Sequence, residues 1–79
     1  MPLRVAVLTI SDACARGLRA DASGDAAVAW AAARGHVVAA RAVVPDESAA
    51  IAARLAAWCD DDVAALVLTT GGTGLAPRD

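Results

Sequence analysis

The densest group of residues able to do chemistry follows a hydrophobic segment near the end of the chain, in the run Leu68-Thr69-Thr70-Gly71-Gly72-Thr73-Gly74-Leu75-Ala76-Pro77-Arg78-Asp79. Glycines allow positive φ and lack the Cβ that would hold a ligand away from the backbone. Successive amide N–H groups in such a turn can bind an anion, and threonine hydroxyls add donors. The segment Thr70 to Gly74 is therefore either a phosphate-binding loop or only a tight turn between a strand and a helix. It contains neither a Walker motif nor a dinucleotide-binding fingerprint.

Two carboxylates stand beside turns that could hold a ligand. Asp46 comes directly after Val44-Pro45, and Asp79 is the first acid after the glycine-rich loop. Partly hydrated Mg²⁺ commonly takes one or two carboxylates together with substrate phosphates, so this pair is a candidate magnesium site. The alternative makes Asp46 a helix N-cap and Asp79 an ordinary loop acid. Two interpretations also remain for Ser11 and Asp12, which either contact a ligand or only form a turn.

The elements that must position these residues follow from hydrophobic patterning. Apolar, β-branched runs predict strands at Arg4 to Ile10, Val37 to Val44 and Ala64 to Thr69, with helices over Asp25 to Arg34 and from Ser48 to about Cys59. Strands that alternate with helices imply right-handed crossovers and a parallel sheet. The predicted class is α/β, a three-layer α/β/α arrangement with a mainly parallel sheet. Ligands of such sheets bind beyond the carboxyl ends of the strands, where the polar residues should converge.

Other residues have structural interpretations. Gly35 is placed to end the first helix, and the segment Ser11 to Gly24 is expected to be an ordered loop. Helix-capping candidates are Asp46, Glu47 and Ser48, and core candidates are Trp30, Ile51, Leu55 and Trp58. His36 is expected to be structural or exposed, while Cys14 and Cys59 lack a basic partner and are expected to be inert, reduced thiols.

Composition narrows the class of protein. The chain has 79 residues and is 58% hydrophobic, but alanine dominates and Phe and Tyr are absent, so the core is small and the chain is expected to be a piece of a larger domain. A net charge of −2 without a basic cluster argues against nucleic-acid and membrane-surface binding. There is neither a signal-peptide pattern nor a long apolar run, so the sequence predicts a soluble cytoplasmic protein.

Several motifs together resemble one family. They are Val7-Leu8-Thr9-Ile10-Ser11-Asp12, Gly17, Asp21-Ala22-Ser23-Gly24, Val44-Pro45-Asp46-Glu47 and the glycine-rich loop with Arg78-Asp79. In this order they are similar to the MoaB/Mog family of molybdenum cofactor biosynthesis. The resemblance implies a molybdopterin-binding α/β fold, usually trimeric. In the adenylyltransferase branch, Mg-ATP transfers AMP to the terminal phosphate of molybdopterin.

Matching motif by motif, the resemblance assigns catalysis to Asp46 and Asp79, which would also hold Mg²⁺. Substrate binding falls to Ser11, Asp12 and the loop residues Thr70, Gly71, Gly72, Thr73 and Gly74. The expected partners are molybdopterin, a homotrimer and other proteins of cofactor biosynthesis. One departure is Asp25, which stands where many relatives have proline.

The resemblance covers roughly the first half of the family domain, so residues 1–79 are expected to be its N-terminal part. Two other functions stay open. One is a non-catalytic molybdopterin-binding or carrier homologue, and the other is a phosphate-binding α/β domain of the competence-damage type.

Overall fold

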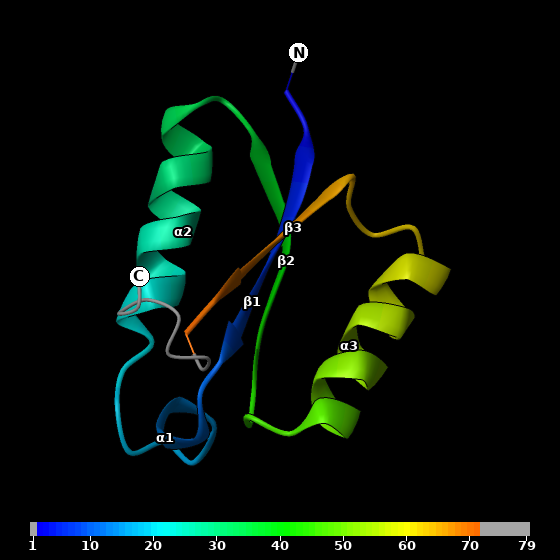
Figure 1. Ribbon diagram of the computed structural model, residues 1–79. Coiled ribbons are helices and arrows are strands. Elements are labelled where there is room, and N and C mark those ends of the chain that lie inside the picture. The colour runs from blue at the N-terminus through cyan, green and yellow to red at the C-terminus, as the bar shows by residue number, and fades with distance from the viewer. Residues whose placement is uncertain (1, 72–79) are drawn as a thin grey trace, which may run out of the picture.

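A parallel sheet between two layers of helix forms the fold. The computed structural model describes residues 2–71. Strands β1 (Arg4–Ile10), β2 (Val37–Val44) and β3 (Leu66–Thr70) form a parallel sheet in the order β2-β1-β3. Helices α2 (Ala22–Ala33) and α3 (Ser48–Asp60) lie on opposite faces of this sheet (Figure 1). The predicted three-layer α/β/α class is confirmed.

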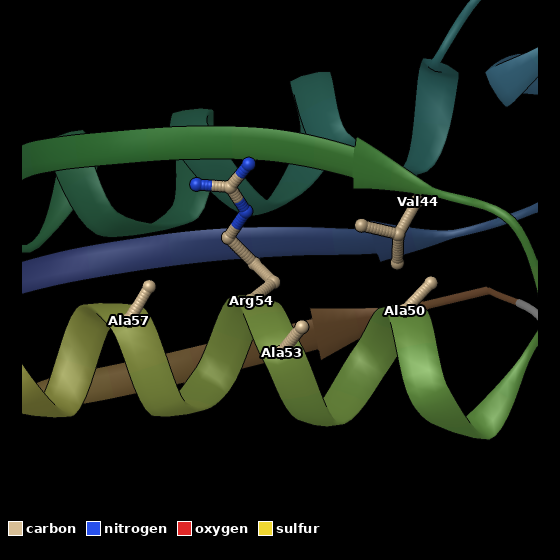
Figure 2. A pocket seen from close by; sticks show the side chains of 5 residues that line it. All are labelled: Val44, Ala50, Ala53, Arg54 and Ala57. Carbon is tan, nitrogen blue, oxygen red and sulfur yellow. The ribbon is translucent and has the colours of Figure 1, made fainter.

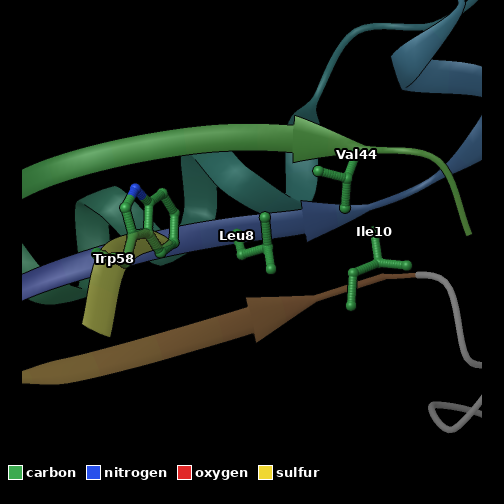
Figure 3. Close-up of a cluster of buried hydrophobic side chains, with 5 residues drawn as sticks. Leu8, Ile10, Val44 and Trp58 are labelled. Atoms are coloured by element: carbon green, nitrogen blue, oxygen red, sulfur yellow. The ribbon is translucent and has the colours of Figure 1, made fainter. Parts of the chain in front are cut away.

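Strand β1 is the centre of the core because it is apolar at nearly every position and covered on both faces. Val5 and Val7 pack with Ala31 of α2. The residues that alternate with them face α3, where Leu8 and Ile10 join a cluster with Val44 and Trp58 (Figure 3). Side chains alternate between the two faces of a strand, so the continuous apolar run of β1 supplies both halves of the core.

Helix α2 begins earlier than predicted. Its first residue is Ala22 rather than Asp25, because the carboxylate of Asp21 accepts a hydrogen bond from the Gly24 amide and caps the first turn. At the other end the prediction for Gly35 is confirmed. Its φ is +78°, and the amides of Gly35 and His36 bond back to α2 carbonyls in a Schellman-type arrangement.

Helix α3 packs as predicted but begins without a side-chain cap. Ile51 and Leu55 pack against the core cluster, and Trp58 is only 7% exposed. Glu47 occupies the N-cap position, but its side chain makes no capping bond. The simple interpretation of Asp46 as the N-cap is therefore wrong.

Trp30 departs from its predicted role in the core. It is 41% exposed, and the Arg34 guanidinium lies 4.4 Å from its ring centroid. The apolar stripe of α2 that faces the sheet is carried by the small residues Ala27, Val28 and Ala31 instead. Because alanine lets the helix lie close to the sheet, the large indole ring extends away from the core.

The remaining boundaries differ in small ways. The segment expected as a loop contains the one-turn helix α1 (Asp12–Ala15), and the third strand begins at Leu66 rather than Ala64. His36 is structural as expected, since its Nδ1 accepts a hydrogen bond from the Leu3 amide at 3.1 Å. Cys14 and Cys59 are free thiols. Within residues 2–71, the helices are too short or too polar to cross a membrane.

Candidate functional site

The carboxyl ends of β1 and β2 are tied together by two hydrogen bonds. The Ser11 amide donates to the Val44 carbonyl at 2.9 Å, and the Asp46 amide donates to Asp12 Oδ1 at 2.9 Å. Each strand here passes directly into a polar loop, and these bonds hold the two loops side by side. The predicted convergence of Ser11, Asp12 and Asp46 at one edge of the sheet is what the structure shows.

These three residues differ in which of their side-chain donors and acceptors remain free to bind a ligand. The Ser11 hydroxyl oxygen accepts a bond from the Cys14 amide at 3.2 Å and so caps α1, while its proton can still be donated. Asp12 holds the Asp46 backbone with one carboxylate oxygen. Asp46 is exposed, and its side chain makes no hydrogen bond or ion pair within residues 2–71. Asp12 therefore positions Asp46, whose carboxylate faces solvent.

The β3 end reaches the same edge through Gly71. This residue has φ +72°, and a Cβ added there would lie 2.9 Å from the Ile10 carbonyl oxygen at the end of β1. A left-handed backbone in close contact with another strand requires glycine. Gly71 therefore lets the chain leave β3 directly over the end of β1.

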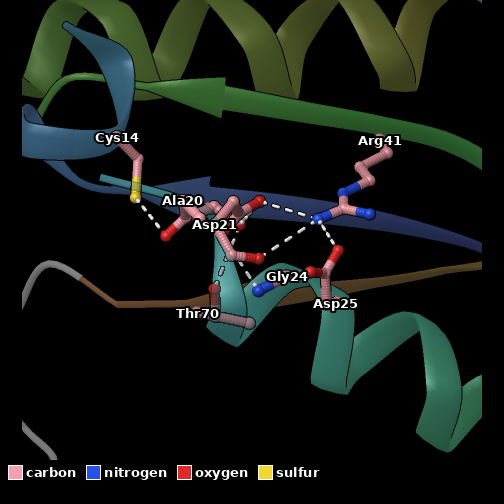
Figure 4. Close-up of polar contacts among 8 residues, drawn as sticks. Cys14, Ala20, Asp21, Gly24, Asp25, Arg41 and Thr70 are labelled. Atoms are coloured by element: carbon pink, nitrogen blue, oxygen red, sulfur yellow. Dashed lines mark hydrogen bonds and ion pairs between the residues drawn. The ribbon is translucent and has the colours of Figure 1, made fainter. Parts of the chain in front are cut away.

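Beneath this edge lies a polar network that the sequence patterns did not reveal (Figure 4). Thr70 Oγ1 lies 3.2 Å from Thr9 Oγ1, which in turn lies 2.9 Å from Asp21 Oδ2. Thr9 is 1% exposed, so its hydroxyl is satisfied by these protein groups. Asp21 lies in the segment expected to be an ordered loop, yet it connects α2 to β1 and through Thr9 to β3.

Arg41 of β2 neutralises the acidic end of this network. Its guanidinium lies 3.1 Å from Asp21 Oδ2 and 2.7 Å from Asp25 Oδ1. Burial raises the pKa of Asp21, but hydrogen bonds from Arg41, the Gly24 amide and Thr9 outweigh this effect, and the net pKa lies below its ordinary value. Asp25 supplies the second carboxylate for Arg41.

A bulge in β2 explains why Arg41 reaches α2. Val5 pairs with Val38 but Ala6 pairs with Ala40, so one extra residue interrupts the register. Val38 packs on the α2 face, whereas Ala40 packs on the α3 face. The shift puts Arg41 on the same face as α2. Arg41 is the one charged residue in an apolar strand, and this was the signal in the sequence that could have indicated the network.

Gly24 is required by the same network. A Cβ built at this position would lie 2.8 Å from Thr9 Oγ1 and 2.7 Å from the Asp21 carboxyl carbon. Asp21 cannot swing away easily because Thr9, Gly24 and Arg41 all hold it. The Asp21-Ala22-Ser23-Gly24 motif thus serves both helix capping and packing beneath the site.

Part of the predicted site lies outside the described residues. This applies to Gly72, Thr73, Gly74 and Asp79, and so to the Asp46–Asp79 pair expected to hold Mg²⁺. Within residues 2–71, no three His, Cys, Asp or Glu side chains gather into a metal site. The exposed Asp46 carboxylate is nevertheless the hard oxygen donor that Mg²⁺ prefers when substrate phosphates complete its shell.

A shallow groove lies elsewhere, between the end of β2 and α3 (Figure 2). Its volume is about 330 Å³, and it is lined by Val44, Ala50, Ala53, Arg54 and Ala57. None of the predicted site residues lines it. The groove adjoins the polar edge described above only through Val44, whose carbonyl accepts the Ser11 amide there.

Comparison with known proteins agrees with this architecture. The family described as "Probable molybdopterin binding domain" matches residues 6–79. The chain belongs to this family.

Members of the family that resemble the chain are longer than it is. It is 40% identical to "Molybdenum cofactor biosynthesis protein B" of Escherichia coli K12, over 100% of this chain and 45% of that protein. The Bacillus subtilis protein of the same name is 38% identical over 98% of the chain and 44% of its own length. The chain thus spans less than half the length of these relatives.

A solved structure shows the same fold. The crystal structure titled as the molybdopterin biosynthesis enzyme MoaB from Thermus thermophilus superposes with a TM-score of 0.84 at 45% identity. The match covers 96% of this chain and 48% of the crystallised one. The family assignment and the parallel sheet expected from the motifs are therefore confirmed together.

Proposed function

We propose that this chain is the N-terminal part of a single molybdopterin-binding domain, whose full-length protein adenylylates molybdopterin during molybdenum cofactor biosynthesis. The observation that carries the proposal is the polar edge of the sheet, where Asp12 holds the Asp46 backbone and Gly71 leaves β3 against the end of β1. The relatives described above all bear molybdenum cofactor or molybdopterin biosynthesis names, which favours this role over a competence-damage-type domain.

The proposed reaction transfers AMP from ATP to the terminal phosphate of molybdopterin. A phosphate oxygen of molybdopterin attacks the α-phosphorus of ATP, and pyrophosphate leaves. Positioning and charge neutralisation supply most of the rate in such chemistry, and bound Mg²⁺ would neutralise phosphate charge. We assign Asp46 and Asp79 to hold Mg²⁺ and orient the reacting phosphate. We assign Ser11, Asp12 and the loop Thr70 to Gly74 to substrate binding.

Adenylylation by the full-length protein tests this assignment. The protein is incubated with molybdopterin and Mg-ATP, and adenylylated pterin and pyrophosphate are measured. We expect Asp46→Asn and Asp79→Asn each to lower the rate by at least ~100-fold while the thermal unfolding midpoint stays within a few degrees. Glu47→Gln is the matched control, because Glu47 is an exposed neighbouring acid whose side chain makes no hydrogen bond to the described residues 2–71.

The outcomes separate the alternatives. Molybdopterin that binds but is never adenylylated, even by the unaltered protein, would indicate the carrier role. Normal rates in both Asn variants would remove these two acids from the chemistry. The homotrimer, the cytoplasmic location and contacts with other biosynthetic proteins belong to the same proposal, and light scattering of the full-length protein tests the trimer.

A further inference from the structure

Three oxygen atoms lead from the buried start of α2 to the end of β3. The distance from Asp21 Oδ2 to Thr9 Oγ1 is 2.9 Å, and that from Thr9 Oγ1 to Thr70 Oγ1 is 3.2 Å. An ionised carboxylate can only accept hydrogen bonds, and each threonine hydroxyl has a single proton. Thr9 must therefore donate to Asp21. The bond between the two threonines then takes its proton from Thr70.

The ionised state of Asp21 is built into its surroundings. Arg41 lies 3.1 Å from the same carboxylate oxygen that accepts from Thr9, and the Gly24 amide binds the other oxygen at 3.0 Å. These contacts lower the pKa of Asp21 against the effect of its burial. The direction of the chain of hydrogen bonds is thus set at neutral pH.

We propose that the Thr70 hydroxyl is a hydrogen-bond acceptor for an N–H group of the ligand, and that Asp21 and Thr9 are positioning residues that set this polarity. Rather than donating to a phosphate, Thr70 presents lone pairs at the edge of the site. A pterin carries an exocyclic amine at C2, and we assign this amine as the donor that Thr70 requires. The inference rests on the proposed pterin-binding function. It assigns Thr70 to bind the pterin end of the ligand.

One substitution should reverse the chain of hydrogen bonds. In Asp21→Asn we expect the amide oxygen to face the Gly24 amide, because that buried backbone group can only donate and cannot turn away. The exposed Arg41 guanidinium, which also can only donate, keeps its bond to Asp25 and turns from the new NH₂ group. The NH₂ group then faces Thr9 and donates to it. Thr9 in turn donates to Thr70, whose proton is released toward the ligand. The variant keeps the helix cap and changes Thr70 from acceptor to donor.

The affinities of two small ligands test the direction of these hydrogen bonds. Pterin and lumazine differ at C2, where pterin has a donating amine and lumazine an accepting carbonyl. Their affinities for the full-length protein are measured by fluorescence titration. We expect the unaltered protein to prefer pterin by about tenfold or more, and Asp21→Asn to reverse the order. Thr70→Val should abolish the preference, and Thr70→Ser, which keeps the hydroxyl, should retain it.

The possible results distinguish a failure of this inference from a failure of the proposed pterin-binding function. If the unaltered protein prefers pterin and Asp21→Asn keeps that preference, the polarity role is wrong; the same holds if Thr70→Val keeps it. If the unaltered protein binds neither ligand nor molybdopterin, the proposed function itself fails. Thr9→Val is the second variant if Asp21→Asn is unstable, because it interrupts the chain with a similar volume and should bring the two affinities close to equality.

Discussion

At the scale of single residues, Asp21 connects more of the described molecule than any of the predicted catalytic positions within it. It caps α2 through the Gly24 amide, fixes the hydroxyl of Thr9 and pairs with Arg41. Its side chain is only 13% exposed, so these bonds replace water that the carboxylate has lost. The sequence motif by itself suggests only that Asp21 caps a helix. In the folded chain its carboxylate also fixes Thr9 and Arg41 beneath the polar edge of the sheet.

The network makes acid stability a test of Asp21. Because its pKa is lowered on folding, the ionised carboxylate stabilises the fold at neutral pH. This contribution is lost as the pH falls from about 4 through the folded-state pKa. We expect Asp21→Asn to lower the urea midpoint at pH 7 and to flatten its fall between about pH 5 and pH 2. Parallel curves for Asp21→Asn and the unaltered protein would contradict the assignment.

At the scale of elements, the two helices pack against the two faces of the sheet with side chains of different size. Helix α2 approaches the sheet through alanine and valine, whereas α3 inserts Leu55 and Trp58. The bulge in β2 serves both layers, since Val38 before it packs toward α2 and Ala40 and Ala42 after it pack toward α3. This arrangement leaves one tryptophan in the core and the other against an arginine at the surface.

The tryptophans therefore predict unequal stability losses. We expect Trp58→Ala to cost about 3–5 kcal/mol in unfolding free energy, as for other buried aromatic side chains. Trp30→Ala should cost less, about 1–2 kcal/mol, since the indole is 41% exposed and removes less apolar surface from water than Trp58 does. Urea denaturation of the full-length protein measures both. Equal losses would show that another part of that protein covers Trp30.

At the scale of the whole molecule, the sheet order puts the most buried strand, β1, between two strands that are less buried. Residues Val5 to Ile10 are all buried, whereas β2 alternates between exposed and half-buried side chains along most of its length. Within residues 2–71, both β2 and β3 have one neighbouring strand each. Stability should therefore be concentrated in β1.

Hydrogen exchange tests this distribution. We expect the β1 amides of the full-length protein to exchange only through global unfolding, and the unpaired outward amides of β2 to exchange at least about tenfold faster through local opening. Mass spectrometry of peptides across each strand measures the difference. Amides of β3 that exchange as slowly as those of β1 would show that a further segment of the full-length protein pairs with β3.

Much of the architecture could be predicted because it depends on local patterns. The strand from Arg4 to Ile10 and the strand from Val37 to Val44 have the predicted bounds, since continuous apolar runs allow few alternatives. The parallel order and the meeting of Asp12 with Asp46 follow from helical crossovers, which bring the carboxyl ends of strands to one edge. The predicted start of α2, Asp25, lies after the observed start at Ala22. Gly24 is typical of a turn, and this signal hides the cap at Asp21.

By itself, then, the sequence determined the family, the layers and the edge of the sheet where Ser11, Asp12 and Asp46 converge, because periodicity and motif spacing are properties of the chain order. Only the tertiary structure decided that Trp30 is exposed, that Arg41 faces α2 and that Thr9 joins Asp21 to Thr70. These facts depend on a bulge of one residue and on the closeness of helix to sheet. Both arise from packing between segments that are distant in sequence, so no local pattern records them.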